Sequence, residues 1–207
     1  MIYGIVGSGG KTTLVHRMAE ENRKKGKKVF VTTSTHMAIE PDTLLTDDPQ
    51  EIIQELEEKG YVMAGIREGK RIRALSPETY EQVCAHADVV LVEADGSNRL
   101  PVKYPNATEP VIYDNMEEIL VVCAPHAIGK TLKEAAFRKE LVLECLQVSE
   151  EERIRASHIQ KLVRQGYLKN LCEKYPDKRI RICPAHLDTP EQIEIARMLA
   201  EDRTIYD

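Results

Sequence analysis

The chain has 207 residues, of which 42% are hydrophobic, so it is long enough to build one domain with a sizeable core. Its 29 Lys and Arg residues against 34 Asp and Glu residues give a net charge of −5, which argues against general nucleic-acid binding, since that requires a basic surface. No apolar run approaches membrane-spanning length, and a strand is expected from residue 2 onward, so we expect neither a membrane anchor nor a signal peptide.

The first predicted elements are a strand, a glycine-rich turn and a helix. The apolar residues 2–6 lead into the run Gly7-Ser8-Gly9-Gly10-Lys11-Thr12-Thr13, and a helical spacing of apolar residues follows. Glycines let backbone N–H groups surround an anion without Cβ clashes, and the helix turns its positive N-terminal end toward the same anion. Lys11 can reach terminal phosphates, and the Thr12 hydroxyl can coordinate Mg²⁺. This pattern predicts a phosphate-binding loop.

The loop departs from the strict Walker A pattern, because Ile5 stands where that pattern has its first Gly. The first loop Gly is Gly7, which gives a compact Gly-x-x-Gly-Lys-Thr loop of a form that some nucleotide-dependent ligases use. The alternative interpretation is a strand-to-helix turn with a solvated lysine. The preceding strand, the Lys-Thr-Thr run and the apolar helix together favour phosphate binding.

The following segments alternate between predicted strands and helices. We expect a strand at 29–33, a helix over 50–59 that ends before Gly60, and a helix that opens at Ser76-Pro77. Between these helices, Tyr61 to Ile66 and Arg71 to Leu75 predict a β-hairpin. This hairpin breaks the alternation and is expected to form an antiparallel edge of the sheet.

The remaining segments continue the same alternation. Apolar runs at 88–92 and 119–123 are typical of strands that are buried on both faces. Residues 132 to 175 are predicted to be helical throughout, with breaks near Ser149 and Gly166. An edge strand at 179–183 and a final helix from Pro190 complete the predicted elements. Together they predict an α/β fold in which residues 1–207 form a single P-loop NTPase-like domain. We expect a three-layer sandwich whose mostly parallel sheet has helices on both faces.

The cysteines indicate a reducing compartment. They are odd in number, widely spaced and form no Cys-x-x-Cys pair, which makes a disulfide framework or a structural zinc site improbable. They are Cys84, Cys123, Cys145, Cys172 and Cys183. Buried, reduced thiols in a cytoplasmic protein are therefore expected.

A second candidate site is the acidic end of the apolar strand, in the run Val92-Glu93-Ala94-Asp95-Gly96. Ligands of open parallel sheets collect at the carboxyl ends of the strands, where the phosphate loop is also expected. Glu93 and Asp95 can face the same way, so one can hold Mg²⁺ while the other orients an attacking water or substrate. Gly96 can bring its backbone N–H near a terminal phosphate. The alternative is a loop with solvated acids, and the phosphate loop favours the functional interpretation.

Polar residues also follow the second strand, in the run Thr32-Thr33-Ser34-Thr35-His36. Their hydroxyls can touch water, Mg²⁺ or phosphate. Threonine is equally common in ordinary strands, so the two interpretations stay open. His36 has no second ligand at helical or hairpin spacing, and we expect a surface or hydrogen-bonded histidine.

Cations follow the acidic run directly, in Asn98-Arg99-Leu100-Pro101-Val102-Lys103. Arg99 and Lys103 can stabilise charge that develops on a transferred phosphoryl group. The spacing alone fits a proline-braced loop with solvated charges somewhat better.

The segment Pro184-Ala185-His186-Leu187-Asp188-Thr189 follows the last predicted strand, where guanine-nucleotide proteins carry an Asn-Lys-x-Asp loop. Only Asp188 matches, since Ala185 and His186 stand at the Asn and Lys positions. Guanine selectivity cannot be inferred from this segment, and Asp188 can equally cap the last helix.

Taken in order, these motifs resemble one family. The phosphate loop, Thr32-Thr33-Ser34-Thr35, Glu93-Ala94-Asp95-Gly96-Ser97 and Pro101-x-Lys103 with Glu109-Pro110 resemble the selenium-dependent hydroxylase accessory proteins of the YqeC type. The resemblance is specific over residues 1 to about 112 and weakens after them, where only Asp188-Thr189-Pro190 still fits. It implies a cytoplasmic nucleotide-binding protein linked to the maturation of molybdenum hydroxylases, and it strengthens Lys103 and Glu109 as site residues.

The sequence therefore predicts a protein that binds Mg²⁺ with ATP or GTP and hydrolyses the nucleotide or transfers its phosphoryl group. The expected nucleotide contacts are Gly7, Ser8, Gly9, Gly10, Lys11, Thr12, Thr13 and Gly96, the expected metal ligands are Thr12, Glu93 and Asp95, and the expected catalytic residues are Lys11, Asp95 and Lys103. The partner that the resemblance implies is a molybdenum hydroxylase or its maturation machinery. A small-molecule kinase or ligase, a slow nucleotide-dependent switch or metallochaperone, and a degenerate scaffold that binds no nucleotide stay open as alternatives.

Overall fold

The computed structural model describes residues 1–187 and 189–201, and these fall into two compact units. The first unit contains residues 1–5, 12–96 and 111–117, and the second contains 6–11, 97–110 and the chain from 118 onward. The chain passes from one unit to the other several times, and strand β1 (Ile2–Gly7) contributes residues to both. The expectation of a single domain over 1–207 stays a prediction.

The first unit is built on parallel strands. β1 pairs with β8 (Val89–Glu93), β8 with β2 (Val29–Thr33), β2 with β5 (Tyr61–Ala64), and β5 with β4 (Thr43–Leu44), every pair in parallel. The residues of β2 and β8 are all buried, as the apolar runs predicted for strands covered on both faces.

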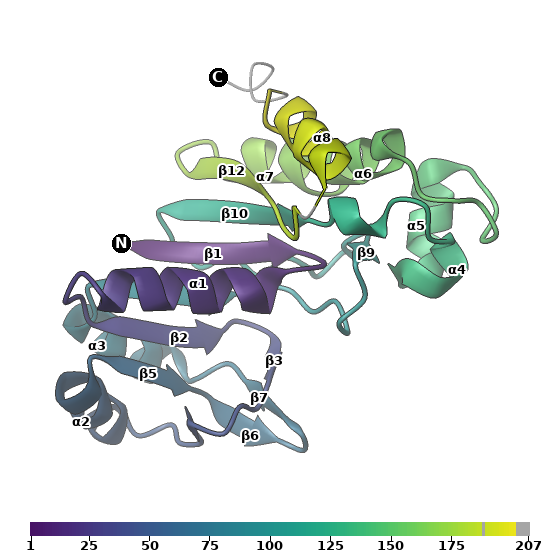
Figure 1. Cartoon of the computed structure of the whole chain (residues 1–207). Coiled ribbons are helices and arrows are strands. Elements are labelled where there is room, and N and C mark those ends of the chain that lie inside the picture. The colour runs from purple at the N-terminus through teal and green to yellow at the C-terminus, as the bar shows by residue number, and fades with distance from the viewer. Residues whose placement is uncertain (188, 202–207) are drawn as a thin grey trace. The chain divides into compact units, whose positions relative to one another are not determined.

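Helices cover both faces of these strands. Figure 1 shows α1 (Lys11–Arg23) in front of the strands and α3 (Pro77–His86) behind them, and α2 (Pro49–Lys59) packs against α3 and β5. The predicted caps are present, since the Ser76 hydroxyl accepts a hydrogen bond from the Thr79 N–H and Gly60 ends α2 in the left-handed conformation. The local signals thus placed these helix ends correctly.

The predicted hairpin needs correction. Tyr61 to Ala64 forms β5 of the main sheet, and a separate antiparallel sheet contains β3 (His36–Ala38), β7 (Arg71–Arg73) and β6 (Ile66–Glu68) in that order. Gly65 lies between the strand of the main sheet and the first strand of the small sheet. A Cβ at this position would lie 2.9 Å from both the Arg73 carbonyl oxygen and Ile72 Cβ, so the close approach of the chain here requires glycine. The hairpin exists, but it is not an edge of the main sheet.

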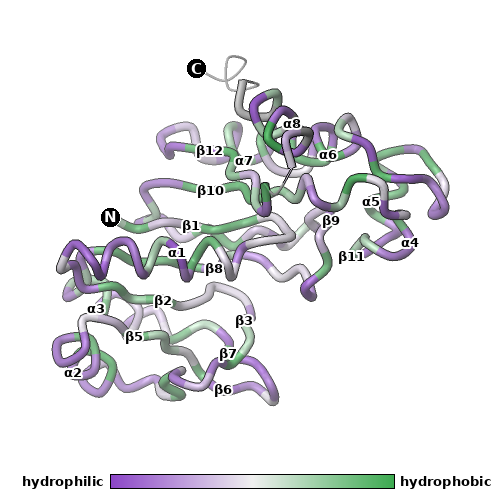
Figure 2. Tube along the Cα trace, viewed as in Figure 1, coloured by the Kyte–Doolittle hydropathy of each residue, from purple (hydrophilic) through white to green (hydrophobic). Residues whose placement is uncertain are grey.

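The second unit has its own strand pairs. β10 (Glu118–Cys123) pairs in parallel with β12 (Arg179–Pro184), and β9 (Val102–Lys103) pairs in parallel with β11 (Ala136–Phe137). Every residue of β10 is buried, and Figure 2 shows its hydrophobic character along the trace. In the described residues the main parallel sheet has seven strands, with β12 at one end of the order and β4 at the other. The prediction of an α/β fold with a mostly parallel sheet is confirmed.

The prediction of helix over 132–175, with breaks near Ser149 and Gly166, is wrong in two places and right in the rest. The helices are α4 (Leu132–Ala135), α5 (Lys139–Leu146), α6 (Ala156–Val163) and α7 (Lys169–Lys174). Strand β11 interrupts the first two, since Ala136 and Phe137 pair with β9, a contact that helical periodicity cannot reveal. A break near Ser149 exists between α5 and α6, whereas Gly166 lies inside a π-helical turn, η2 (Arg164–Leu168), that joins α6 to α7.

The remaining elements are a short 3₁₀ turn, η1 (Pro125–Ala127), and the final helix α8 (Pro190–Glu201), which begins at the predicted proline. The Thr189 hydroxyl accepts a hydrogen bond from the Gln192 N–H at the start of α8. The prediction about Asp188 lies outside the described residues. In the part of the chain that the structure describes, no helix has the length and apolar character needed to cross a membrane.

Candidate functional site

The glycine loop after β1 adopts backbone angles that only glycine takes easily. Gly7, Gly9 and Gly10 have φ of 94°, 73° and 149°. A Cβ on Gly7 would lie 2.0 Å from the Val122 carbonyl oxygen, and one on Gly9 would lie 2.4 Å from Ala124 Cβ. The loop therefore lies directly against the end of β10, and the glycines are required by both conformation and space.

Lys11 closes this loop. Its side chain is buried, and its Nζ donates a 2.7 Å hydrogen bond to the Gly7 carbonyl oxygen. The backbone N–H of Ser8 donates to the Val122 carbonyl, and the Ser8 hydroxyl donates to the Pro101 carbonyl. The ammonium is thus held over a loop of close-packed backbone, which is the arrangement that a phosphate-binding loop requires.

The segment after β12 lies against the same loop. A Cβ on Gly10 would meet Ala185 Cβ at 2.3 Å and the His186 ring at 3.5 Å, and the His186 ring packs edge-on against His126. The structure therefore places Ala185 and His186 beside the glycine loop. These two residues stand where a guanine-reading segment would carry Asn and Lys. Sequence reasoning did not single out His126, because no motif surrounds it.

The hydroxyl residues after Lys11 begin helix α1. Thr12 and Thr13 are both exposed in its first turn, where the free N–H groups and the positive end of the helix dipole favour an anion. Both belong to the first unit by contact, while Lys11 belongs to the second. Their hydroxyls are accessible to a ligand.

Both predicted carboxylates lie at the end of β8 in the first unit. Glu93 is 8% exposed and Asp95 is fully buried. Ile5 stands opposite Glu93 in the parallel β1–β8 pair, so the two strands end at the same edge, as open parallel sheets require of a ligand site. Gly96 follows with no atom within 4 Å of the position its Cβ would take.

The hydroxyl run at the end of β2 holds neighbouring backbone, including that of Glu93. Thr33 Oγ1 donates to the Glu93 carbonyl oxygen at 2.7 Å, Ser34 Oγ donates to the Val111 carbonyl, and Thr32 Oγ1 donates to the Ala64 carbonyl. Because these hydroxyl protons are used on carbonyl oxygens, the side chains cannot also donate to a phosphate. His36, as expected, is exposed and hydrogen-bonded, with Glu68 as its partner at 2.6 Å.

Lys103 is buried and belongs to a partly buried ion cluster in the second unit, which we call the Glu109 cluster: Lys103, Glu109 and Arg138. The Lys103 Nζ lies 2.7 Å from Glu109 Oε2, and Arg138 binds both oxygens of the same carboxylate at 2.5 and 3.2 Å. Burial raises the pKa of Glu109, but hydrogen bonds from Arg138 and Lys103 outweigh it and hold the pKa below its usual range. Arg138 was missed from the sequence, since it lies 29 residues from Glu109.

The donor set of the first unit suits Mg²⁺. Thr12 carries a hydroxyl, and Glu93 and Asp95 carry carboxylates, and oxygen atoms of these kinds are the hard ligands that this ion prefers. Among the described residues no group of three or more His, Cys, Asp or Glu side chains could hold a metal. The five cysteines are free thiols.

Comparisons with known proteins agree with the motifs. Residues 3–140 match the family described as "YqeC protein". The protein YqeC of Escherichia coli (strain K12) is 28% identical over 182 residues, which is 82% of this chain and 71% of the relative.

Solved structures show only a loose likeness. In the MinC:MinD cell division protein complex of Aquifex aeolicus, one chain is 17% identical with a TM-score of 0.36, over 96% of this chain and 86% of that chain. An apo GTPase from Pyrococcus abyssi is 15% identical with a TM-score of 0.28, over 99% of this chain and 97% of that chain.

Proposed function

The chain belongs to the YqeC family, and we propose that it binds a nucleoside triphosphate, ATP or GTP, with Mg²⁺. The observation that carries this proposal is the loop Gly7–Lys11, whose three glycines have positive φ and whose buried lysine is held over the loop backbone. Such a loop offers N–H groups and a positive charge to a polyphosphate at the start of a helix. A glycine-rich turn with a solvated lysine would not bury the ammonium in this way.

Within the proposed site, the residues have separable roles. Lys11 neutralises phosphate charge, Thr12 and Thr13 contribute hydroxyls at the start of α1, and Thr12, Glu93 and Asp95 hold the metal. The bound Mg²⁺ would offset charge on the phosphates. Asp95 is proposed to orient the nucleophile, and Gly96 to offer its N–H to a phosphate. Lys103 can act on a phosphoryl group only if its ammonium gives up Glu109, so its assignment as a catalytic residue stays a prediction.

We further propose that this nucleotide-dependent protein acts in the cytoplasm in the maturation of selenium-containing molybdenum hydroxylases. The support is the ordered set of motifs that resembles the accessory family, together with the five free thiols. Hydrolysis of the nucleotide, phosphoryl transfer or a slow switch would each serve such a role. Association with a hydroxylase that depends on added nucleotide would test the partner.

Calorimetric titration with ATP and GTP, with and without Mg²⁺, tests the binding proposal directly. Lys11→Ala is expected to weaken the affinity at least about 100-fold, because it removes a charge-assisted contact. Lys24→Ala is the matched control, since Lys24 pairs with Glu20 on the surface just after α1 and lies outside the loop. If Lys11→Ala binds and turns over both nucleotides as the wild type does, the proposal fails.

A small-molecule kinase or ligase is the second candidate function. The glycine loop favours it, since its compact Gly-x-x-Gly-Lys-Thr form is one that some nucleotide-dependent ligases use. Stimulation of turnover by one added metabolite would separate this function from a switch.

A further inference from the structure

The turn that follows the acidic run has an unusual backbone. Among the described residues, five other than glycine have a positive φ: Asn98, Arg99, Arg138, Gln147 and His186. Only Asn98 and Arg99 are consecutive, with φ of 49° and 62°, and the Leu100 N–H closes their turn on the Ser97 carbonyl oxygen at 2.9 Å. Asparagine adopts this conformation fairly readily, whereas a long side chain such as arginine does so at a cost in stability that glycine would avoid.

Two of the other residues with positive φ show why such a conformation is kept. Gln147 ends helix α5 and donates its N–H to the Leu143 carbonyl oxygen, as left-handed residues at helix ends commonly do. Arg138 has an anionic partner, since its guanidinium binds both oxygens of Glu109. Arg99 differs from both, because it is exposed and its side chain makes no hydrogen bond or ion pair with the described residues. Backbone strain without a compensating contact inside the chain is typical of a functional position.

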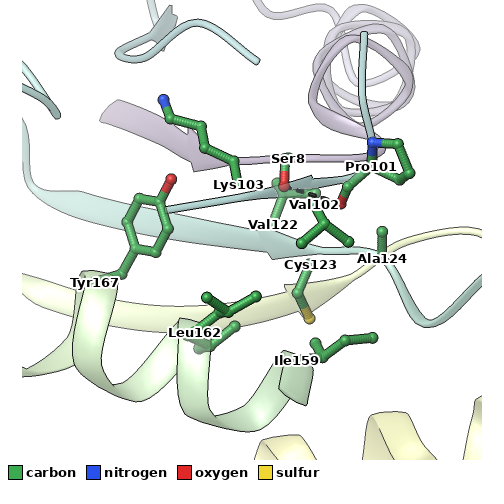
Figure 3. Close-up of a pocket in the computed structure, with 11 residues that line it drawn as sticks. Ser8, Pro101, Val102, Lys103, Val122, Cys123, Ala124, Ile159, Leu162 and Tyr167 are labelled. Atoms are coloured by element: carbon green, nitrogen blue, oxygen red, sulfur yellow. Dashed lines mark hydrogen bonds between the residues drawn. The ribbon is translucent and has the colours of Figure 1, made fainter. Parts of the chain in front are cut away.

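The turn is tied to the glycine loop through Pro101. Figure 3 shows the Ser8 hydroxyl beside Pro101, to whose carbonyl oxygen it donates at 2.9 Å. A Cβ on Gly9 would lie 3.0 Å from Pro101 Cα, so the two segments are in direct contact within the second unit. Arg99 comes two residues before Pro101, and two residues span at most about 7 Å. The long side chain of arginine can cover such a distance, so its guanidinium can reach an anion seated on the loop.

Arg99 is also the better suited of the two cations in this segment. Lys103 is buried, and its ammonium is bound to Glu109. The exposed guanidinium of Arg99 keeps its charge at any pH at which the protein folds, and its planar set of N–H donors matches two oxygens of a phosphate group.

We propose that Arg99 binds the phosphate chain of the nucleotide on the glycine loop, and that the left-handed turn is kept because it presents this guanidinium. The inference rests on the proposed function, since it requires a polyphosphate on the loop. Arg99 then supplies the second cation of the phosphate site beside Lys11, while Lys103 stays with Glu109.

The variant Arg99→Gly separates the side chain from the turn. Glycine takes a φ of 62° without strain, so the midpoint of urea unfolding should not fall. The affinity for the Mg²⁺ complex of ATP or GTP, measured by calorimetry, should fall at least about tenfold, because a charge-assisted hydrogen bond is lost. Gln147→Gly is the matched control, since it makes the same change at an exposed residue with φ of 59°, and it should leave the affinity unchanged.

Inorganic tripolyphosphate tests which part of the nucleotide Arg99 contacts. Because the proposed contact is to phosphate, Arg99→Gly should weaken the binding of tripolyphosphate by a factor similar to that for the nucleotide. A loss seen with the nucleotide alone would place Arg99 at the base or ribose and overturn the proposal. Wild-type affinity of Arg99→Gly for both ligands would overturn it as well, and so would an equal loss in Gln147→Gly.

Failure of this inference differs from failure of the proposed function. If Arg99→Gly binds nucleotide as the wild type does while Lys11→Ala does not, the loop binds nucleotide and only the role of Arg99 is wrong. If the wild type binds neither nucleotide nor tripolyphosphate, the proposed function fails, and the role of Arg99 fails with it.

Discussion

Two lysines of the second unit are buried by different means, and the difference bears on what each can do. Lys11 donates to a backbone carbonyl four residues away, within its own loop. Lys103 lies against a carboxylate that Arg138 also binds. A hydrogen bond to a neutral carbonyl is readily exchanged for one to phosphate, whereas leaving a buried carboxylate costs several kcal/mol. Lys11 is therefore suited to bind a ligand, and Lys103 to hold β9 in place.

The two regions also depend on different features of the chain. The loop requires the absence of side chains at Gly7, Gly9 and Gly10, whereas the Glu109 cluster requires the presence of three particular ones. Substitutions should therefore damage the first by steric collision and the second by leaving charge uncompensated.

Gly7→Ala should be the most damaging change. Its φ of 94° and the 2.0 Å separation between the new Cβ and the Val122 carbonyl oxygen combine backbone strain with a collision, so we expect a loss of at least about 3 kcal/mol. Gly26→Ala is the matched control, with a φ of 74° and no atom within 4 Å, and should cost about 1 kcal/mol. Urea unfolding measures both. Equal losses of unfolding free energy in the two variants would show that backbone strain, and not the collision with Val122, accounts for the effect of Gly7→Ala.

Glu109→Gln should be the next largest. It leaves Lys103 and Arg138 close together without a carboxylate, and we expect a loss of about 2 kcal/mol, moderated because Arg138 keeps access to solvent. Glu150→Gln removes a surface partner of Lys139 and should cost much less. The free energy of unfolding in urea, measured for both variants, checks the difference. A loss no larger than that of Glu150→Gln would show that the cluster does not hold β9.

The smallest predicted effect is a pH dependence of the same cluster. The pKa of Glu109 is lowered from 4.5 in the folded protein, so its stabilising contribution is complete above that value and is lost as the pH falls through the folded-state pKa. The difference in unfolding free energy between the wild type and Glu109→Gln should shrink below about pH 4.5. Other carboxylates titrate in both proteins and cancel. A difference that stays constant down to pH 3 would contradict the prediction.

Short-range signals made much of the fold predictable. The Ser76 cap, the left-handed Gly60 and the alternation of apolar runs each depend on residues within a few positions of one another, so the strands and helices that they define were placed correctly. The glycine loop belongs to this group, because strand, turn and helix are adjacent in the chain. Whether its residues bind nucleotide stays a prediction.

Other features depend on partners that the sequence does not reveal. Gly65 divides a predicted strand between two sheets because Ile72 lies against it, and β11 interrupts a helical pattern because Ala136 pairs with Val102. Pairings of this kind join segments whose separation in the chain leaves no periodicity to detect.

Local sequence was enough to predict the class of fold, the glycine loop and the position of two carboxylates at the end of β8, since each follows from local sterics, hydrogen bonding and hydrophobic pattern. Two features could be seen only in the folded chain: Lys103 shares Glu109 with Arg138, and Ala136 pairs with Val102. These arrangements arise from packing between segments that are distant in the chain. They depend on shape and charge that match in space, which no local sequence pattern shows.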